Sequence, residues 1–389
     1  MPDLLQQEIY NRKKKGYNIV ACVMCNHGQQ QYFSDVILLS LQKEKIFYFF
    51  VNECPVNSVQ KISEFKDFFY ITQEAYLKIK GIDLALHSEI YCSSPHVSEI
   101  CFIGHGFPGK HTVWSEENLK SFNHYFLYGP KDRKIFSYIT KNYSNEISNR
   151  INLWEVGYPK YDFQFNVKKS EILKIKQNIG VDNQKPTILF APAWDPEGVL
   201  RTIGLALLKI FKNLKQYNFI VKLHPASLAD KNSKHFNFYT GGIDWKKTIS
   251  DFCKACSSNI LFPDFHSINP LFKISDLMIT DFSGVTQGFF LENKPVISID
   301  CPKFYSETLA QFGSDGKISR SNDLFNNGRK GTFVLSDFKK IDQAIAHVLN
   351  NPNDNAEARK RIALELLYNP GKGTSCMLSS IKNILQIDK

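Results

Sequence analysis

Two short stretches of this 389-residue chain place a histidine directly after an apolar run. In FIGHGFPGKHTVW the apolar run ends and is followed at once by His105 and Gly106. In VKLHPAS, His224 precedes a proline, which cannot continue a strand ladder. A histidine at such a position can act as a general base or donate a hydrogen bond to a phosphate oxygen. Glycine beside it lets the backbone approach a ligand closely.

A third stretch, ISDLMITDFSGVTQGFFLENKPVISID, predicts an anion-binding loop. An apolar strand leads into Asp281, Ser283 and Gly284, and a helix is expected over residues 284–292. The unpaired N–H groups of a helix N-terminus attract anions, and the hydroxyls of Ser283 and Thr286 add side-chain donors. The alternative is plain N-capping by Asp281 or Ser283, which is compatible with phosphate binding.

The sequence gives little support for a metal site or for a nucleotide-binding P-loop. No two aspartates stand two residues apart, and GKGTS near the end lacks the strand that precedes a P-loop. The pairs Cys22/Cys25 and Cys253/Cys256 have the spacing of zinc ligands, but neither is followed by a compact set of four. We therefore expect reduced cysteines and a metal-independent protein without a cofactor.

The elements that position these residues alternate between strand and helix. The length favours two domains, and the alternation predicts an α/β fold with parallel sheets covered on both faces. The pattern restarts at PTILFAPAW, so we expect one domain over 1–165 and a second domain over 166–365. A last helix over 366–389 is expected to pack back on the N-terminal domain.

The predicted strand ends gather polar residues. Ligands of open parallel sheets bind beyond the carboxyl ends of the strands. Candidate ligand-binding residues are His27, Gly106, Lys110 and His111 in the first domain, and Trp194, Arg201, Lys222, Asp281, Ser283, Gly284 and Thr286 in the second.

The net charge of +10 predicts attraction to polyanions or, alternatively, only a solvated lysine-rich surface. The basic segments RKKK, KKSEILKIK and RKR are scattered, which disfavours a nucleic-acid-binding protein. No apolar run reaches the roughly 20 residues that cross a bilayer, and the N-terminus lacks the order of a signal peptide. We expect a cytoplasmic protein that the basic segments could hold on anionic lipid at the inner face of the membrane.

Several motifs in order carry a family resemblance. HG.P.K, GYPKYD, ILFAPAWD, VKLHP and SDLMITDFSGV…KPVISID together resemble the CDP-glycerol glycerophosphotransferase family of teichoic-acid and capsule polymerases. The resemblance covers roughly residues 100–300, and YNPGKGTS is similar to the closing segment of the family.

The resemblance implies a GT-B fold, with an N-terminal Rossmann-like acceptor domain over 1–165 and a C-terminal Rossmann-like nucleotide-donor domain over 166–365 that face each other across a cleft. The candidates of the first domain are then acceptor-binding residues, and those of the second are donor-binding residues. It also implies transfer of a polyol phosphate from a CDP-polyol to the hydroxyl of a saccharide or lipid-linked acceptor, with release of CMP. His105 then corresponds to the general base and His224 to the donor-phosphate histidine, while Ser283 and Gly284 correspond to the diphosphate loop. The alternative function is a glycosyltransferase of the same fold that uses a CMP-, UDP- or GDP-linked sugar.

The sequence departs from the family pattern at three places. Lys160 stands where the family usually has arginine, and Gly284 stands where a second serine is common. The arginine that usually follows the tryptophan is missing after Trp194, and Arg201 is close enough in sequence to replace it. These departures leave the identity of the donor open.

Overall fold

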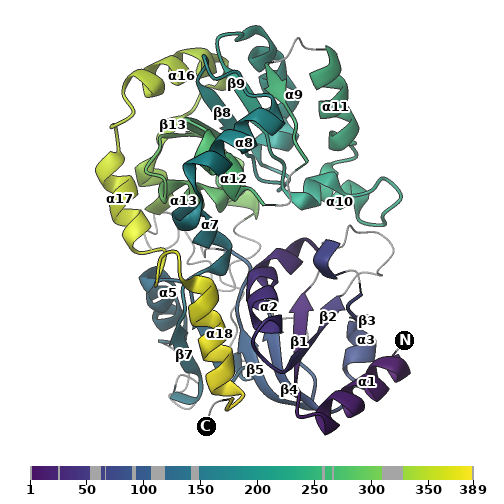
Figure 1. The fold of residues 1–389 in the computed structure, drawn as a ribbon. Helices are drawn as coiled ribbons and strands as arrows, with labels where there is room; N and C mark the ends of the chain where they lie inside the picture. The colour runs from purple at the N-terminus through teal and green to yellow at the C-terminus, as the bar shows by residue number, and fades with distance from the viewer. Residues whose placement is uncertain are drawn as a thin grey trace. The chain divides into compact units, whose positions relative to one another are not determined.

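The structure is a computed structural model, and its described residues form two compact units (Figure 1). The described residues are 2–24, 27–52, 63–65, 67–89, 93–106, 119–141, 149–255, 259–264, 267–308 and 327–387. The N-terminal unit holds those up to Gly106, those from 119 to Phe165 and those from Leu367 onward, and the C-terminal unit holds Asn166–Leu366. Within these ranges, no helix has both the length and the apolar character needed to cross a membrane.

The described part of the N-terminal unit is built on a parallel sheet in the order β3-β2-β1-β4-β5-β6-β7 (Figure 1). Its strands are β1 (Asn18–Met24), β2 (Ile46–Asn52), β3 (Tyr70–Thr72), β4 (Ile82–His87), β5 (Val97–Phe102), β6 (His124–Leu127) and β7 (Asn152–Glu155). Its helices include α1 (Pro2–Lys14), α2 (Ser34–Leu41), α3 (Gln73–Tyr76), α5 (Pro130–Thr140), α7 (Asp162–Asn166) and α18 (Gly373–Ile384), with 3₁₀ turns η1 (His27–Tyr32) and η4 (Pro159–Tyr161).

Helices cover both faces of this sheet. Runs such as NIVACVM and IFYFFVN are almost wholly buried, as expected for strands of a parallel sheet between two helical layers. Ile19 and Ala21 of β1 pack in one cluster with residues of α1 and α3. Tyr48 of β2 packs on the other side, where its hydroxyl donates to Ser40 of α2 at 2.9 Å.

The GYPKYD and YNPGKGTS motifs meet in the N-terminal unit. Asp162 accepts the backbone N–H groups of Gly373 and Thr374 at 2.9 and 2.7 Å, and so caps α18, which packs against α2 (Figure 1). Gly157 adopts a φ of +85°, and a Cβ there would lie 2.2 Å from the carbonyl oxygen of Tyr368. These motif residues therefore join the closing segment to the sheet.

The described part of the C-terminal unit has a parallel sheet in the order β10-β9-β8-β11-β12-β13. Its strands are β8 (Thr187–Phe190), β9 (Asn218–Val221), β10 (Ile260–Leu261), β11 (Leu277–Thr280), β12 (Val296–Ile299) and β13 (Phe333–Leu335). Its helices include α8 (Lys169–Ile179), α9 (Val199–Asn213), α10 (Phe236–Thr240), α11 (Trp245–Ala255), α12 (Asn269–Ile274), α13 (Val285–Phe290), α16 (Ile341–Asn350) and α17 (Ala356–Leu364), with the 3₁₀ turn η5 (Pro225–Leu228).

Helix α9 supplies much of the core of this unit. Leu200, Leu207, Leu208 and Phe211 are buried and recur at the spacing of one helical face, so they pack together with the strand residues. Both sheets start at a central strand and run outward in two directions, as in the Rossmann fold.

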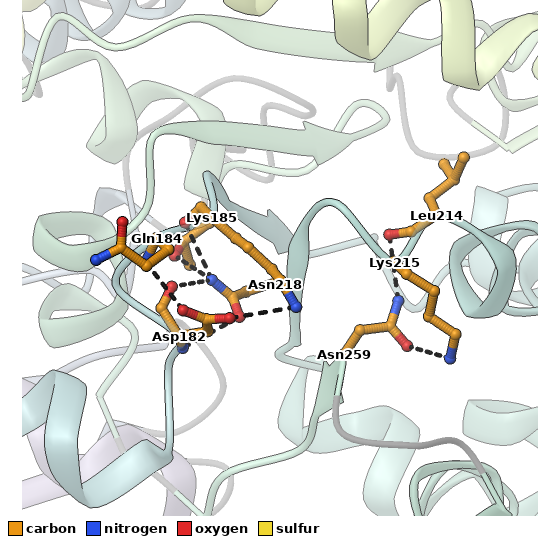
Figure 2. A network of polar contacts seen from close by, with 8 residues as sticks. Asp182, Gln184, Lys185, Leu214, Lys215, Asn218 and Asn259 are labelled. Carbon is orange, nitrogen blue, oxygen red and sulfur yellow. Dashed lines mark hydrogen bonds and ion pairs between the residues drawn. The ribbon is translucent and has the colours of Figure 1, made fainter.

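Asparagine side chains hold the amino ends of β9 and β10 (Figure 2). Asn218 donates to the carbonyl of Asp182 at 2.9 Å and accepts the N–H of the same residue at 3.2 Å. Asn259 donates to the carbonyl of Phe211 at 2.8 Å and accepts from Lys215 Nζ at 3.2 Å. These amides therefore satisfy backbone groups at the amino edge of the sheet, opposite the edge where the loops of the candidate site begin.

Several elements were not predicted from the sequence, among them helices α3, α5, α10 and α11. Strand β4 is central, since it pairs with both β1 and β5, yet the run IDLALH was not recognised as a strand. Strand β13 and helix α1 were also not predicted. The expected helix after Gly284 is shorter than predicted, because α13 ends at Phe290.

Candidate functional site

In the N-terminal unit, His105 lies just beyond β5, next to the loop that follows β4. Its Nδ1 is 3.0 Å from Glu89 Oε1 and 3.1 Å from the carbonyl oxygen of Ser88. Both neighbours are acceptors, so the proton of the neutral imidazole is assigned to Nδ1 and the lone pair to Nε2. The His105 side chain is 46% exposed, which leaves the ring accessible. This is the arrangement that a general base requires.

Glu89 is itself held in place by buried polar groups. Gln29 Nε2 donates to Glu89 Oε1 at 2.7 Å, and Ser88 Oγ donates to Gln29 Oε1 at 2.8 Å. Gln29 and Ser88 are buried, and the Glu89 side chain is only 14% exposed. These residues follow β1 and β4, the two strands at which the direction of the sheet order reverses. Sequence reasoning missed Glu89 because it missed β4.

A tyrosine cluster lies beside His105. The Tyr32 ring is 6.3 Å from the His105 ring and 6.1 Å from the Tyr158 ring, measured between centroids. Lys160 Nζ lies 5.3 Å from the Tyr32 centroid, within the range of a cation–π contact. Lys160 therefore brings a positive charge to the His105 region.

The other acceptor-side candidates are placed as follows. His27 begins η1, the turn that follows β1. Gly106 is exposed, and a Cβ there would meet nothing within 4 Å. Lys110 and His111 lie outside the described residues, as do Cys25 and Cys256.

In the C-terminal unit, His224 follows β9 and caps η5. Its Nδ1 accepts the backbone N–H of Ala226 at 3.1 Å. The proton of the neutral ring is therefore on Nε2, the reverse of the assignment for His105. An exposed imidazole in this tautomer presents an N–H donor, which suits a phosphate oxygen.

An aromatic cluster lies beside His224 and meets it through Trp194. The Trp194 ring lies 6.3 Å from His224, 5.8 Å from Phe238 and 5.3 Å from Tyr239, between centroids. Phe238 is 58% exposed although it is a large apolar side chain. Sequence reasoning missed Phe238 and Tyr239, and the run FNFY in α10 was the available signal.

Asp281 organises the loops around this site. Its carboxylate accepts the backbone N–H of Ala193 at 3.0 Å, that of Val199 at 3.0 Å and that of Ser283 at 3.1 Å. Val199 is the first residue of α9, so Asp281 caps α9 rather than α13. These contacts favour a positioning role for Asp281, which fixes the loop that carries Trp194.

The loop from Ser283 to Thr286 differs from the predicted anion-binding helix N-terminus. Gly284 precedes α13, a helix of six residues, and Thr286 Oγ1 donates to the carbonyl of Ser283 at 2.8 Å. The Thr286 hydroxyl proton is thus engaged within the turn. A Cβ at Gly284 would meet nothing within 4 Å, so the surface beside Ser283 is open at this point.

The two candidate cations of this unit differ in their surroundings. Lys222 is partly buried, and burial lowers its pKa, while the carboxylate of Asp264 opposes that change. Arg201 donates through Nη1 to the carbonyl of Phe238 at 3.0 Å, and its guanidinium packs against Gly241. Arg201 therefore supports α10, directly under the aromatic residues.

Two further motif residues stabilise the scaffold. Lys294 Nζ donates to the carbonyls of Phe272, Lys273 and Ser275 at 3.0, 2.8 and 2.7 Å, which caps the C-terminal end of α12. Asp276 accepts the N–H of Thr187 at 2.8 Å. Among the described residues, no group of three or more His, Cys, Asp or Glu side chains is placed to hold a metal ion.

Comparisons with known proteins match this chain to one protein family. A family model described as CDP-glycerol:poly(glycerophosphate) glycerophosphotransferase matches residues 98–312, more than half of the chain. The teichoic acid poly(glycerol phosphate) polymerase of Bacillus spizizenii is 27% identical over 53% of this chain and 50% of its own length. The minor teichoic acid biosynthesis protein GgaB of Bacillus subtilis is 27% identical over 70% of this chain and 28% of its own length. This chain thus spans half or less of these relatives.

Solved structures show the same fold. The wall teichoic acid polymerase TagF superposes with a TM-score of 0.63 at 15% identity, covering 96% of this chain and 90% of that one. UDP-GlcNAc 2-epimerase from Neisseria meningitidis superposes with a TM-score of 0.53 at 12% identity, covering 94% and 100%. The predicted fold class, α/β with two Rossmann-like parallel sheets of the GT-B type, is confirmed.

Proposed function

Because this chain belongs to the CDP-glycerol:poly(glycerophosphate) glycerophosphotransferase family, we propose that it transfers a polyol phosphate, such as glycerol phosphate, from a CDP-linked donor to an acceptor hydroxyl. The acceptor oxygen forms a bond to the distal phosphorus of the donor. The bond from that phosphorus to the bridging oxygen breaks, and CMP leaves with the electron pair. The family match over residues 98–312 is the observation that carries the proposal. The product belongs to a cell-surface polymer of the teichoic acid type.

The C-terminal unit supplies the donor site in this proposal. His224 presents Nε2–H to a phosphate oxygen, because its Nδ1 accepts the N–H of Ala226. Lys222 follows β9 and Ser283 follows β11, the strands on either side of β8, and they add a cation and a hydroxyl. Such donors stabilise the negative charge that develops on the leaving phosphate. Trp194 supplies an aromatic ring beside His224.

The N-terminal unit supplies the base. His105 carries its proton on Nδ1, so Nε2 is the nitrogen that removes the proton of the acceptor hydroxyl. General base catalysis of this kind contributes about 10²–10⁴-fold to the rate. The acceptor is a saccharide or a lipid-linked chain that offers a primary or secondary hydroxyl.

The test is nucleotide binding followed by CMP release. We expect CDP-glycerol, CDP-ribitol, CDP and CMP to raise the melting temperature, and UDP and GDP to leave it unchanged. His224→Ala should lose this response, whereas His347→Ala, on the exposed side of α16, should keep it. A preference for UDP or GDP would instead support a sugar transferase. No response to any nucleotide would overturn the donor site.

We also propose that basic segments hold the protein on anionic lipid at the inner face of the cell membrane. Helix α1 ends in Arg12, Lys13 and Lys14, and α8 begins at Lys169 after Lys168. Co-sedimentation with vesicles should rise with the fraction of acidic lipid and fall with salt. Equal binding to neutral and acidic vesicles would contradict this.

A further inference from the structure

We propose that Glu89 is a positioning residue for the base His105, and that it fixes the imidazole with Nε2 toward the acceptor hydroxyl. The inference rests on the proposed function, because it assigns His105 the role of base. Glu89 is held between two donors, Gln29 Nε2 at 2.7 Å and His105 Nδ1 at 3.0 Å, which both meet its Oε1 atom. A carboxylate that accepts from Nδ1 sets both the tautomer and the ring orientation of a histidine.

The position of Glu89 is itself constrained by the core. The Ser88 hydroxyl, which has one proton to donate, lies 2.8 Å from Gln29 Oε1 and 3.2 Å from the carbonyl oxygen of Val23 in β1. The backbone N–H of Ser88 donates to the same carbonyl at 3.0 Å, so the start of this loop continues the pairing of β4 with β1. Glu89 is therefore anchored to two buried strands.

A second glutamate–histidine pair in the same unit, Glu99 and His124, differs from Glu89 and His105 in the contacts of the ring nitrogens. His124 Nε2 lies 3.1 Å from Glu99 Oε2, but His124 Nδ1 accepts from Trp154 Nε1 at 3.1 Å. Both ring nitrogens of His124 are engaged, and the side chain is only 9% exposed. This pair lies where β6 begins, at the amino edge of the sheet. In His105, by contrast, both acceptors lie at Nδ1, so Nε2 is the nitrogen that faces the acceptor hydroxyl in the proposed reaction.

The charge of Glu89 has a defined task in the transfer step. When the acceptor oxygen attacks phosphorus, its proton moves to His105 Nε2 and the ring becomes an imidazolium. The carboxylate 3.0 Å from Nδ1 stabilises that positive charge. Among the described residues, Lys160 Nζ lies 5.3 Å from the centroid of Tyr32, whose ring is 6.3 Å from that of His105, and the positive charge of Lys160 opposes formation of the imidazolium. The negative charge of Glu89 therefore offsets the effect of Lys160 on the imidazolium.

Two substitutions of Glu89 distinguish its effect on the orientation of the His105 ring from the effect of its negative charge. Glu89→Gln keeps an oxygen that can accept from His105 and Gln29 but removes the negative charge. We expect the acidic limb of the kcat/KM–pH profile, measured by CMP release, to move to lower pH, with KM for the CDP-linked donor unchanged. Glu89→Ala removes the oxygen as well, and kcat should fall about 10–100-fold. Glu99→Gln is the matched control, and it should leave both the profile and kcat as in the wild type.

A double-mutant cycle decides whether Glu89 acts through His105. In the His105→Ala background, Glu89→Gln should have no further effect on kcat, because the two residues form one unit. If Glu89→Gln and Glu89→Ala leave kcat and the pH profile unchanged while His105→Ala abolishes activity, the inference is overturned and the proposed function stands. If His105→Ala retains full activity, the base assignment fails first. Unchanged melting temperatures for the Glu89 variants would exclude unfolding as the cause of a loss.

Discussion

Asp281→Ala is a sharp test of how the C-terminal site is built. The substitution removes the acceptor of three backbone N–H groups, those of Ala193, Val199 and Ser283. The Asp281 side chain is 3% exposed, and Ala193 and Val199 are buried too. A buried donor left without a partner costs about 1–3 kcal/mol, so these two lower the free energy of unfolding by about 2–6 kcal/mol. Ser283 is partly exposed, and its N–H can turn to water.

The assay combines stability with local exchange. Urea unfolding of the full chain, followed by far-UV circular dichroism, gives the loss of stability. Hydrogen exchange measured by mass spectrometry over residues 191–199 should show lost protection at Ala193 and Val199. Asp276→Ala is the matched control, because the exposed Asp276 accepts one N–H, that of Thr187 at 2.8 Å. We expect it to cost about 0.5–1.5 kcal/mol.

The opposite pattern would refute this reasoning. The reasoning fails if Asp281→Ala loses no more free energy of unfolding than Asp276→Ala and keeps its exchange protection, yet no longer binds a CDP-linked donor. Asp281 would then contact the donor directly. Asp281→Asn sharpens the distinction. Its amide oxygen can still serve Ala193 and Ser283, but its NH₂ group faces the N–H of Val199. The stability of this variant should therefore fall between those of Asp281→Ala and the wild type.

Three further variants and one control test the scaffold. Burial raises the pKa of Asp132 from 3.8 to about 7. A carboxyl whose pKa is raised on folding stabilises the fold at acidic pH, and this contribution is lost as the pH rises through about 7. The melting temperature should therefore fall as the pH rises, and Asp132→Asn should flatten that fall. Lys294→Met leaves three carbonyls at the end of α12 without their donor, so urea unfolding should show a loss of about 2–4 kcal/mol, and an unchanged midpoint would contradict the cap. Gly373→Ala puts a Cβ 2.8 Å from the backbone of Tyr158 and Pro159, so α18 should lose exchange protection, whereas Gly284→Ala, with open space around it, should not alter its helix.

Much of the fold could be predicted from the sequence because strand and helix periodicities are local. The run LMIT and the amphipathic segment from residue 200 to 213 predicted β11 and α9 almost as the structure has them. Their alternation was enough for the confirmed fold class. The prediction failed at β4, where the six residues IDLALH were overlooked although Gly81 and Ser88 flank them in the sequence. That omission also hid Glu89.

The sequence by itself determined which polar residues stand at the ends of strands, since that follows from local spacing. It could not determine which of them meet. Asp281 bonds to Ala193 and Val199, which are 88 and 82 residues away along the chain, because β11 pairs with β8. Glu89 meets His105 because β4 pairs with β5. Strand order is a property of the whole chain, and only the tertiary structure decides whether an aspartate in a motif supports a loop and which nitrogen of a histidine carries the proton.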